Sequence, residues 1–367
     1  MIKKNNNRIL WIDNLKGFIL LMVCLSHLEI FKDFHDFLRP ARMTTFFFIS
    51  GYLFSTKQHS TINSYIKNKF SFLLFPYYKL CFLFALIPLY LHHNNYTHGV
   101  VSKIQQMLEY AQLPQNVISY ILTFYSNIIN ALSGFPQVGP LWFVFTLFQV
   151  SCIFYVFYYF ANQRRYNFIL LTIFTIISIT GGWYCNIHNI SLPLHMHTMF
   201  TALFFFSLGV LLKKTVNNHI SNKFSHKNIL ILCATTLLYI FTNNTYDSFG
   251  IHSNKLGVSF LHFLTTTISG IISLIIIFKI ISSQDKYNLF GIFRNIARNA
   301  LIILPMHYYL KNLCDVVYDN HNSSVYLYTR LLIVILGTII SIIIFRNKLY
   351  WFIGKEKISI KESLSLS

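Results

Sequence analysis

The stretch WIDNLKGFILLMVCLSHL, residues 11 to 28, places Asp13, Lys16 and His27 inside an otherwise apolar run. Ionisable groups are costly in a bilayer, and those that occur there usually face a cavity or a partner. The run follows basic residues, as a signal peptide would, but it lacks a small-residue cleavage site, so we expect it to be retained as a first membrane span.

The composition is typical of an integral membrane protein. Hydrophobic residues make up 54% and charged residues only 11% of the 367 positions, whereas about a quarter of an average soluble protein is charged. A helix that crosses the hydrocarbon layer needs roughly 20 apolar residues. We therefore expect an all-α, polytopic transmembrane helix bundle of about ten spans, over residues 15–31, 40–56, 70–91, 141–161, 166–186, 196–213, 228–244, 258–282, 298–317 and 327–346.

The distribution of the +19 net charge predicts the orientation of these spans. With the N-terminus inside, 21 of the 30 Lys and Arg residues lie on the cytoplasmic side and seven lie outside, while Lys16 and Lys79 lie just within helix ends. Basic residues collect in cytoplasmic loops. We expect both termini in the cytoplasm, and the charge needs no nucleic-acid partner.

The chain is predicted to form one integral membrane domain, residues 1–346, followed by a short cytoplasmic tail, residues 347–367. Chemistry must then reside in the membrane part. Residues 117–135 are apolar enough for a re-entrant or interfacial helix; an eleventh span is the alternative, and the charge bias disfavours it. The six cysteines show no paired metal spacing and are interpreted as buried thiols, with disulfides as an alternative that no spacing supports. His195 and His197 lack a set of partner ligands, so no metal is expected.

Helical geometry relates the charged groups of the first span. Lys16 and His27 are eleven residues apart, close to three turns, so they share one stripe at a separation of roughly 16 Å. Asp13 lies three residues before Lys16, close enough for an ion pair. Lys16 could instead snorkel to the headgroups and His27 could anchor the interface. The alignment, with Arg39 and Arg42 opening the next span, favours a functional cavity.

Six blocks, in order, resemble the acyltransferase family three membrane proteins. In that family a basic residue, ten intervening residues and a histidine form the signature, which Lys16 and His27 match. Three features depart from the usual pattern: Lys16 stands where many members have Arg, Ala300 stands in the usual serine position, and Pro305 is uncommon. The blocks are RILWIDNLKGFILLMVCLSHL (8–28), RMTTFFFISGYLF (42–54), YIKNKFSFLLFPYY (65–78), GPLWFVFTLF (139–148), FFFSLGVLLKK (204–214) and IARNALIILPMHYYL (296–310).

The resemblance implies transfer of an acyl group, most often acetyl, from acetyl-CoA to a sugar hydroxyl of a surface polysaccharide or lipid-linked glycan. It implies a multi-pass protein of the bacterial plasma (inner) membrane. The blocks WIDNLKG and FFFISGY are most similar to the subgroup related to fucose 4-O-acetylases. The expected partners are acyl-CoA, the carbohydrate acceptor and membrane lipid, with no metal. Succinyl or another short acyl group remains an alternative, as does transfer on either side of the membrane.

Within this function, His27 has the chemistry of a general base, because its ordinary pKa lies near neutral pH; a transient acyl carrier is the alternative role. Lys16 is expected to meet the CoA phosphates, with Asp13 orienting it. Arg42 and Ser50 are candidates for stabilising the oxyanion. Alternatively, Arg42 is a loop cation at the lipid surface, and Ser50 is a small residue that, like Gly51 beside it, allows close helix packing.

Three further residues are candidates for substrate binding: Arg39, Trp142 and His307. Trp142 could stack on a sugar ring or serve as an interfacial belt residue. His307 lies two residues after Pro305, where a proline kink frees a backbone carbonyl. It is either a second group in the site or a polar residue whose hydrogen bonds are satisfied within the fold. A flippase for a lipid-linked glycan, without covalent chemistry, is the competing function; a structural partner in polysaccharide assembly is the third.

Overall fold

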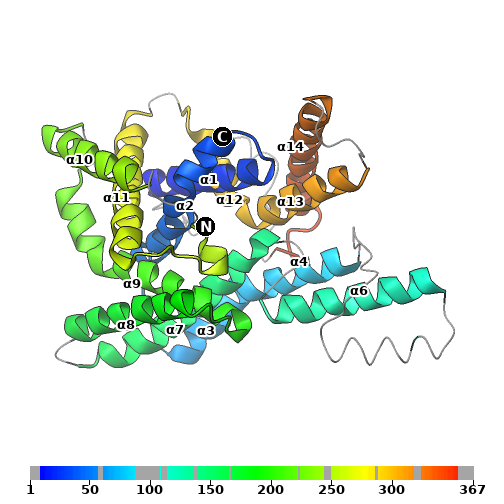
Figure 1. Cartoon of the computed structure of the whole chain (residues 1–367), viewed down its shortest axis with the longest axis horizontal. Helices are drawn as coiled ribbons and strands as arrows, with labels where there is room; N and C mark the ends of the chain where they lie inside the picture. The colour runs from blue at the N-terminus through cyan, green and yellow to red at the C-terminus, as the bar shows by residue number, and fades with distance from the viewer. Residues whose placement is uncertain are drawn as a thin grey trace, which may run out of the picture.

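The computed structural model of the chain is built from helices (Figure 1). It describes residues 9–56, 61–86, 108, 114–134, 139–164, 167–221, 224–243, 249–285, 288–317 and 324–353. Within these ranges the only β-type pairing is one isolated bridge between Gly250 and Lys255. The predicted all-α fold class is therefore confirmed.

The elements follow one another with short connections in most of the described chain. In order they are α1 (Leu10–His27), α2 (Lys32–Tyr52), α3 (Ile62–Lys69), a π-helical turn η1 (Phe70–Leu74), α4 (Phe75–Leu86), α6 (Gln115–Leu132), η2 (Gly139–Leu141), α7 (Trp142–Ala161), α8 (Asn167–Ile187), η3 (Pro193–His195), α9 (Met196–His219), α10 (His226–Asn243), η4 (Ile251–Ser253), α11 (Phe260–Gln284), α12 (Gly291–Arg298), α13 (Ala300–Val317) and α14 (Ser324–Asn347).

Each of the ten expected ranges overlaps a helix, but several boundaries were wrong: α1 spans Leu10–His27 rather than 15–31, and α9 continues to His219 rather than ending at 213. α2 begins at Lys32, eight residues before the expected start, because its charged first two turns continue the helix. The third range begins already at Ile62 and passes through the π-helical turn; its last residues, 87–91, lie outside the described chain. The ninth range is confirmed to within two residues, because α13 begins at Ala300, after the separate short helix α12.

Seven helical runs in the described residues are long and apolar enough to cross a membrane. They are Leu10–His27, Ile62–Leu86, Gly139–Ala161, Asn167–Ile187, Pro193–His219, Phe260–Gln284 and Val325–Asn347. α2, α10 and α13 are not among them. α2 carries five charged side chains in its first eleven residues: Lys32, Asp33, Asp36, Arg39 and Arg42. A multi-pass membrane protein is supported, whereas ten crossings and the orientation of the termini stay predictions.

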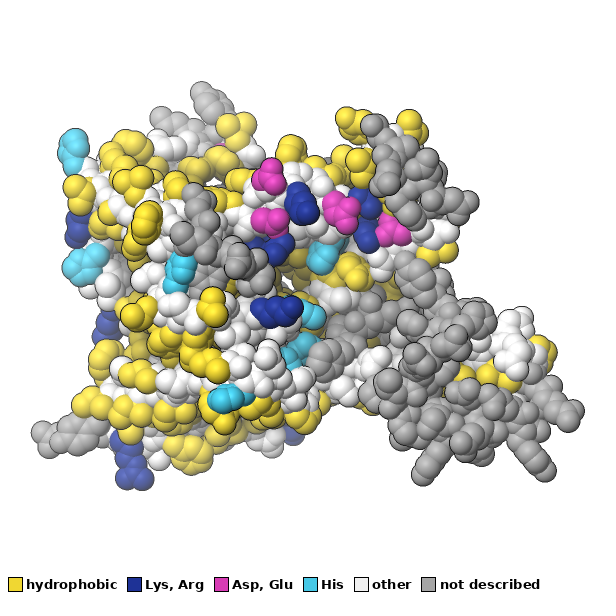
Figure 2. Space-filling view, in the orientation of Figure 1, with side chains coloured by type: hydrophobic (Ala, Val, Ile, Leu, Met, Phe, Trp, Pro, Cys, Tyr) yellow, Lys and Arg dark blue, Asp and Glu magenta, His cyan; other side chains and the backbone are white. Residues whose placement is uncertain are grey.

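The surface of the peripheral helices fits contact with lipid. Large apolar side chains are exposed along α8, including Ile173, Ile176 and Ile177, and along α14, including Leu336 and Ile340. Soluble monomers rarely expose continuous apolar faces of this kind. In Figure 2 hydrophobic side chains cover the lower left of the molecule, over α7 and α8, while charged and histidine side chains gather near its centre.

Glycines bring the central helices into close contact. A Cβ on Gly51 of α2 would lie 1.8 Å from the Phe206 carbonyl oxygen of α9. A Cβ on Gly209 of α9 would lie 2.0 Å from the Phe48 oxygen of α2. Small residues allow such close helix approach in membranes. The reciprocal pair fixes α2 against α9.

The first half of α1 is held by polar and glycine contacts to the C-terminal helices. Asn14 is fully buried; its amide donates to Ser282 Oγ at 2.8 Å and its oxygen accepts from Arg294 at 3.1 Å. Arg294 also pairs with Asp285 at 3.1 Å. A Cβ on Gly17 would lie 1.8 Å from the Phe293 oxygen of α12. These contacts fix the rotation of α1 about its axis.

The helix expected near residues 117–135 is present as α6, where Tyr77 donates a hydrogen bond to the Ala131 oxygen at 2.8 Å. Its relation to the bilayer stays a prediction. Most of the connection 92–140, and the tail beyond residue 353, lie outside the described residues. All six cysteines are free thiols. Cys233 is exposed and Cys152 is only partly buried, contrary to the expectation that all are buried; Cys233 lies on the face of α10 that also exposes Leu230 and Leu237.

Candidate active site

The ionisable stripe of α1 borders two separate cavities. His27 lines one of about 350 Å³, named here the histidine cavity. Lys16 lines another of about 520 Å³, named here the lysine cavity. Both volumes fall in the range of about 300–1,000 Å³ that is usual for small-molecule sites. The spacing of three turns along α1 therefore places Lys16 and His27 in different cavities rather than in a common one.

The histidine cavity combines cationic, imidazole and aromatic side chains. It lies between the C-terminal half of α1, the first half of α2, the start of α7 and the η4 loop, with Leu304 and Tyr308 of α13 also in its wall. Its polar and aromatic lining includes His27, Arg39, Arg42, Trp142, His252 and Tyr308. Four of the eight sequence-predicted site residues thus share one cavity.

His27, in the last turn of α1, is partly exposed to this cavity and contacts α13. Its ring centroid lies 5.5 Å from that of His307 and 5.2 Å from that of Tyr308, which it meets edge-on. One side of the imidazole is therefore fixed by α13 while the cavity remains open beside it. A ring in this position can take a proton from a bound hydroxyl.

His307 lies behind His27 and does not line the cavity. It is 1% exposed, and its Nδ1 lies 2.7 Å from the Ile303 carbonyl oxygen. A carbonyl oxygen only accepts, so Nδ1 carries the proton and Nε2 keeps its lone pair in the neutral ring. Nε2 is buried without a hydrogen-bond partner in the described chain. Such an orphaned nitrogen beside a candidate base is a potential orienting group.

Arg42 is anchored to the helix that carries His27. One terminal nitrogen of its guanidinium donates to the Met22 carbonyl oxygen at 3.0 Å. Its Nε is buried with no hydrogen-bond partner in the described residues. The side chain lines the histidine cavity, so a cation with unused donor capacity lies beside the imidazole. This arrangement can stabilise negative charge that develops in the cavity.

Arg39 and Trp142 lie farther along the wall. Arg39 is exposed, lines the cavity and forms an ion pair with Asp36 on its own helix. Trp142 opens α7 and is only 8% exposed. Its ring contacts His252 edge-on at 5.1 Å between centroids. The indole is thus part of an aromatic wall, not a residue on the lipid face.

The lysine cavity is cationic and lies at the opposite ends of the same helices. Its lining includes Lys16, Ser50, Tyr65, Asn68, Lys69 and Ser151, and none of its lining residues is acidic. Asp13 and Lys69 both interact electrostatically with Lys16, the first favourably and the second by repulsion. Tyr65 stacks on Tyr155 with ring centroids 3.9 Å apart. Two ammonium groups in one cavity suit a polyanion.

Ser50 is not brought together with His27. Its side chain lines the lysine cavity, and its hydroxyl donates to the Phe46 carbonyl oxygen at 2.9 Å. The neighbouring Gly51 makes the close contact with α9 described above. Of the two residues considered for the oxyanion, only Arg42 lies in the cavity of the imidazole.

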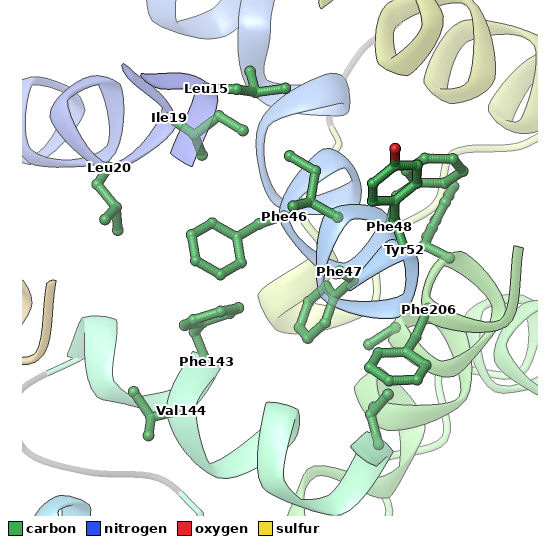
Figure 3. Packing of buried hydrophobic residues seen from close by; sticks show 14 of the residues in the cluster. Leu15, Ile19, Leu20, Phe46, Phe47, Phe48, Tyr52, Phe143, Val144 and Phe206 are labelled. Atoms are coloured by element: carbon green, nitrogen blue, oxygen red, sulfur yellow. The ribbon is translucent and has the colours of Figure 1, made fainter. Parts of the chain in front are cut away.

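A pair of phenylalanines lines the histidine cavity, and one of the two rings also lies near Lys16. Phe46 of α2 and Phe143 of α7 both line the histidine cavity and meet edge-on, with ring centroids 4.6 Å apart (Figure 3). Lys16 Nζ lies 5.6 Å from the centroid of the Phe46 ring. The Phe46 ring is therefore adjacent to both cavities.

Sequence reasoning missed several lining residues. Lys69 lies at the end of α3, directly before the π-helical turn, and π-turns often mark functional sites. The stretch YIKNKF gave a local signal for a basic helix end, but not for a shared cavity with Lys16. His252 comes from a loop between α10 and α11 and carries no local signal at all.

The expectation that no metal takes part stays a prediction. In the described residues no group of three or more His, Cys, Asp or Glu side chains has the arrangement of a metal site. His195, His197 and His252 do lie together, with neighbouring ring centroids 5.4 Å apart. Their rings contribute to the wall behind Trp142.

Comparison with known proteins adds one finding. A family model described as an acyltransferase domain matches residues 9–346. No curated protein and no solved structure gives a significant match. The match covers nearly the whole chain, so the resemblance inferred from the six sequence blocks is confirmed at the level of the family, while the fucose 4-O-acetylase-like subgroup stays a prediction. The protein belongs to acyltransferase family 3.

Proposed function

We propose that this acyltransferase transfers an acetyl group from acetyl-CoA to a sugar hydroxyl of a cell-surface or lipid-linked polysaccharide, in the plasma membrane of a bacterium. One observation carries the proposal: His27 and Arg42 line one cavity, while Lys16, on the same helix, lines a second cavity with Lys69. The two cavities provide separate sites for a donor and an acceptor along one helix.

The lysine cavity is the donor site in this scheme. Lys16 and Lys69 bind the CoA phosphates, and Asp13 orients Lys16. The charge bias of the loops puts this end of the helices on the cytoplasmic side, where acetyl-CoA is made. The pantetheine arm then extends along the stripe of α1 toward Phe46, and its thioester passes the phenylalanine pair to reach His27.

The histidine cavity is the acceptor site. The sugar hydroxyl attacks the thioester carbonyl carbon, and His27 takes the hydroxyl proton as the new C–O bond forms. Arg42 stabilises the oxyanion of the tetrahedral intermediate. The C–S bond then breaks, and the imidazolium returns the proton to the departing CoA sulfur. Arg39 and Trp142 hold the sugar; Ser50, on the donor side, has no part at the oxyanion.

His307 acts through His27 in this scheme. Its Nε2 lone pair is an orphaned acceptor, and its ring centroid lies 5.5 Å from that of His27. A small rotation of His27 allows its second ring N–H to donate to that nitrogen when the other nitrogen receives the hydroxyl proton. The resulting imidazolium is then stabilised by a hydrogen bond in a dry environment. His307 is thus a positioning residue rather than a substrate ligand.

The decisive experiment replaces His27 by Ala and by Gln and measures the O-acyl mass of the surface polysaccharide by mass spectrometry. Loss of a general base removes about 10²–10⁴ of the rate, so both variants should leave the polysaccharide essentially unacylated. Purified protein should show the same loss of acetyl transfer from acetyl-CoA.

His188→Gln is the matched control, because His188 is an exposed histidine that lines neither cavity. This variant should acylate as the wild type does. Retention of full O-acyl mass by His27→Gln would contradict the transferase assignment and favour transport of a lipid-linked glycan.

A further inference from the structure

A third cavity opens beside the histidine cavity. It has a volume of about 260 Å³ and is formed by the end of α8, the connection to α9 and the η4 loop. We name it the loop pocket; its polar lining includes Asn189, Ser191, His197, His252, Ser253 and Lys255. His252 lines both this pocket and the histidine cavity. The two cavities therefore have His252 as a common wall residue.

The loop pocket is pre-formed by buried hydrogen bonds. Asn254 donates to the Gly182 oxygen at 2.8 Å and accepts from Thr201 at 2.7 Å. Asn186 accepts from the Leu256 N–H at 2.7 Å and donates to the Gly257 oxygen at 3.1 Å. These bonds fix the η4 loop against α8 and α9. A rigid rim of this kind lowers the entropy cost of ordering a ligand.

Backbone strain is concentrated at the same place. Of the seven non-glycine residues with positive φ in the described chain, Asn189, Leu194, His195 and Asn254 lie in or next to this pocket. Asparagine tolerates the left-handed region, but leucine and histidine adopt it rarely. Strained backbone of this type gathers at binding sites, where the surrounding structure maintains it. Gln149 helps to hold the strained turn by donating to the Leu194 oxygen at 2.8 Å.

Several polar groups on the rim are open to a ligand. Asn189, Ser191 and Lys255 are exposed, and their side chains make no hydrogen bond within the described ranges. The lining offers amide, hydroxyl, imidazole and ammonium groups and contains no carboxylate. Such a set recognises the hydroxyl and ring oxygens of a sugar. An apolar lipid chain would leave these groups unpaired, which is unfavourable.

Building on the function proposed above, we propose that the loop pocket binds the sugar unit adjacent to the one that is acylated. The acceptor is then a glycan of at least two units, and the enzyme distinguishes it from a free monosaccharide by contacts at Asn189 and Lys255. His252 lies between the two subsites and contacts both sugars.

The test uses purified full-length protein in lipid nanodiscs, with radiolabelled acetyl-CoA. The acceptors are fragments of the de-O-acylated surface polysaccharide of the producing cell, sorted into one, two and three sugar units. Wild type should show a kcat/KM at least tenfold higher for two units than for one, with little further gain for three. The double variant Asn189→Gly/Lys255→Ala, in which glycine keeps the left-handed backbone of position 189, should lose that gain while its kcat/KM for the single unit stays unchanged.

Lys32→Ala is the matched control, because Lys32 is an exposed cation at the start of α2 that lines none of the three cavities. It should keep the full preference for two units. Equal losses for one and two units in the double variant, or an unchanged preference, would overturn the subsite. No transfer to any fragment by wild type would instead reject the proposed function and the subsite with it.

Discussion

Lys16 illustrates how a single side chain is directed by its position on a helix. Three turns separate it from His27, so the two face the same side of α1 but reach different cavities. Leu20 and Val23 occupy the stripe between them and line the histidine cavity. A donor with charged phosphates at one end and a thioester at the other suits this separation. A single small substrate would not need it.

Replacement of Lys16 by Met tests the donor site at the level of one residue. It removes the charge but keeps most of the chain length, so the KM for acetyl-CoA should rise about 10- to 100-fold, as expected for loss of a charge-assisted contact of about 1.5–3 kcal/mol. Steady-state kinetics of the purified protein would measure this, and kcat should change much less. A fall in kcat at unchanged KM would place Lys16 in the chemical step instead.

Lys79→Met is the control for this prediction. Lys79 lies over the rings of Phe75 and Trp351 and donates to the Trp351 oxygen at 3.1 Å, outside the lysine cavity. Its replacement removes an equal charge from the protein but should leave the KM for acetyl-CoA unchanged.

At the scale of elements, the sequence predicted the helices better than their contacts. Periodicity cannot tell polar residues that serve the site from residues that hold helices together. In WIDNLKG, the candidate site residues Asp13 and Lys16 lie next to Asn14 and Gly17, which fix α1 to α11 and α12. α2 was cut short because charged residues normally end a membrane span, whereas here they continue the helix into the histidine cavity. Ser50 also shows that the sequence does not predict contacts. It lies one turn of α2 beyond Phe46 and therefore lines the lysine cavity instead of the histidine cavity.

The contact between α2 and α9 is predicted to tolerate no side chain at Gly51. The Cβ of Gly51→Ala would meet the Phe206 backbone oxygen, which cannot move without displacing α9. Overpacking of this kind costs about 1–3 kcal/mol or more, so the variant should unfold at a lower temperature and elute poorly in detergent gel filtration. Gly181→Ala is the control, because its Cβ would lie at an ordinary 3.5 Å from the Phe200 ring. Equal stability of the two variants would argue against the close contact.

At the scale of the molecule, the site is assembled from segments that are distant in sequence. α1, α2, α7, the η4 loop and α13 all contribute to the histidine cavity. Local patterns gave His27, Arg42 and Trp142 because each lies in a recognisable block. His252 and Lys69 could not be predicted as site residues, since only the packing of the helices brings them there. The family resemblance supplied the activity, which no spacing alone would have given.

The orientation of the bundle is predicted from the charge bias and can be measured directly. In a variant lacking the native cysteines, Lys32→Cys and Lys255→Cys should react with a membrane-impermeant maleimide on intact spheroplasts. Lys214→Cys should react only after permeabilisation. All three positions are exposed in the structure, so accessibility to the reagent reports the side of the membrane. Labelling in the reverse order would invert the proposed donor and acceptor sides.

The separation of the two cavities predicts how the protein selects its acyl group. A thioester that enters from the lysine cavity has to pass Phe46, which is 8% exposed and packs on Phe143. Phe46→Ala should therefore widen this passage, and the rate of butyryl relative to acetyl transfer should rise about tenfold or more, since each methylene that a pocket accepts or rejects is worth about 1–3 kcal/mol. Competition between the two acyl-CoA donors, with products separated by mass, measures the ratio.

Phe48→Ala is the control: Phe48 is also buried but lines neither cavity. Both truncations should lower stability by about 3–5 kcal/mol, so a change of acyl preference confined to Phe46→Ala cannot come from destabilisation. An unchanged preference in that variant would mean that the acyl group reaches His27 by a route that does not pass between α2 and α7.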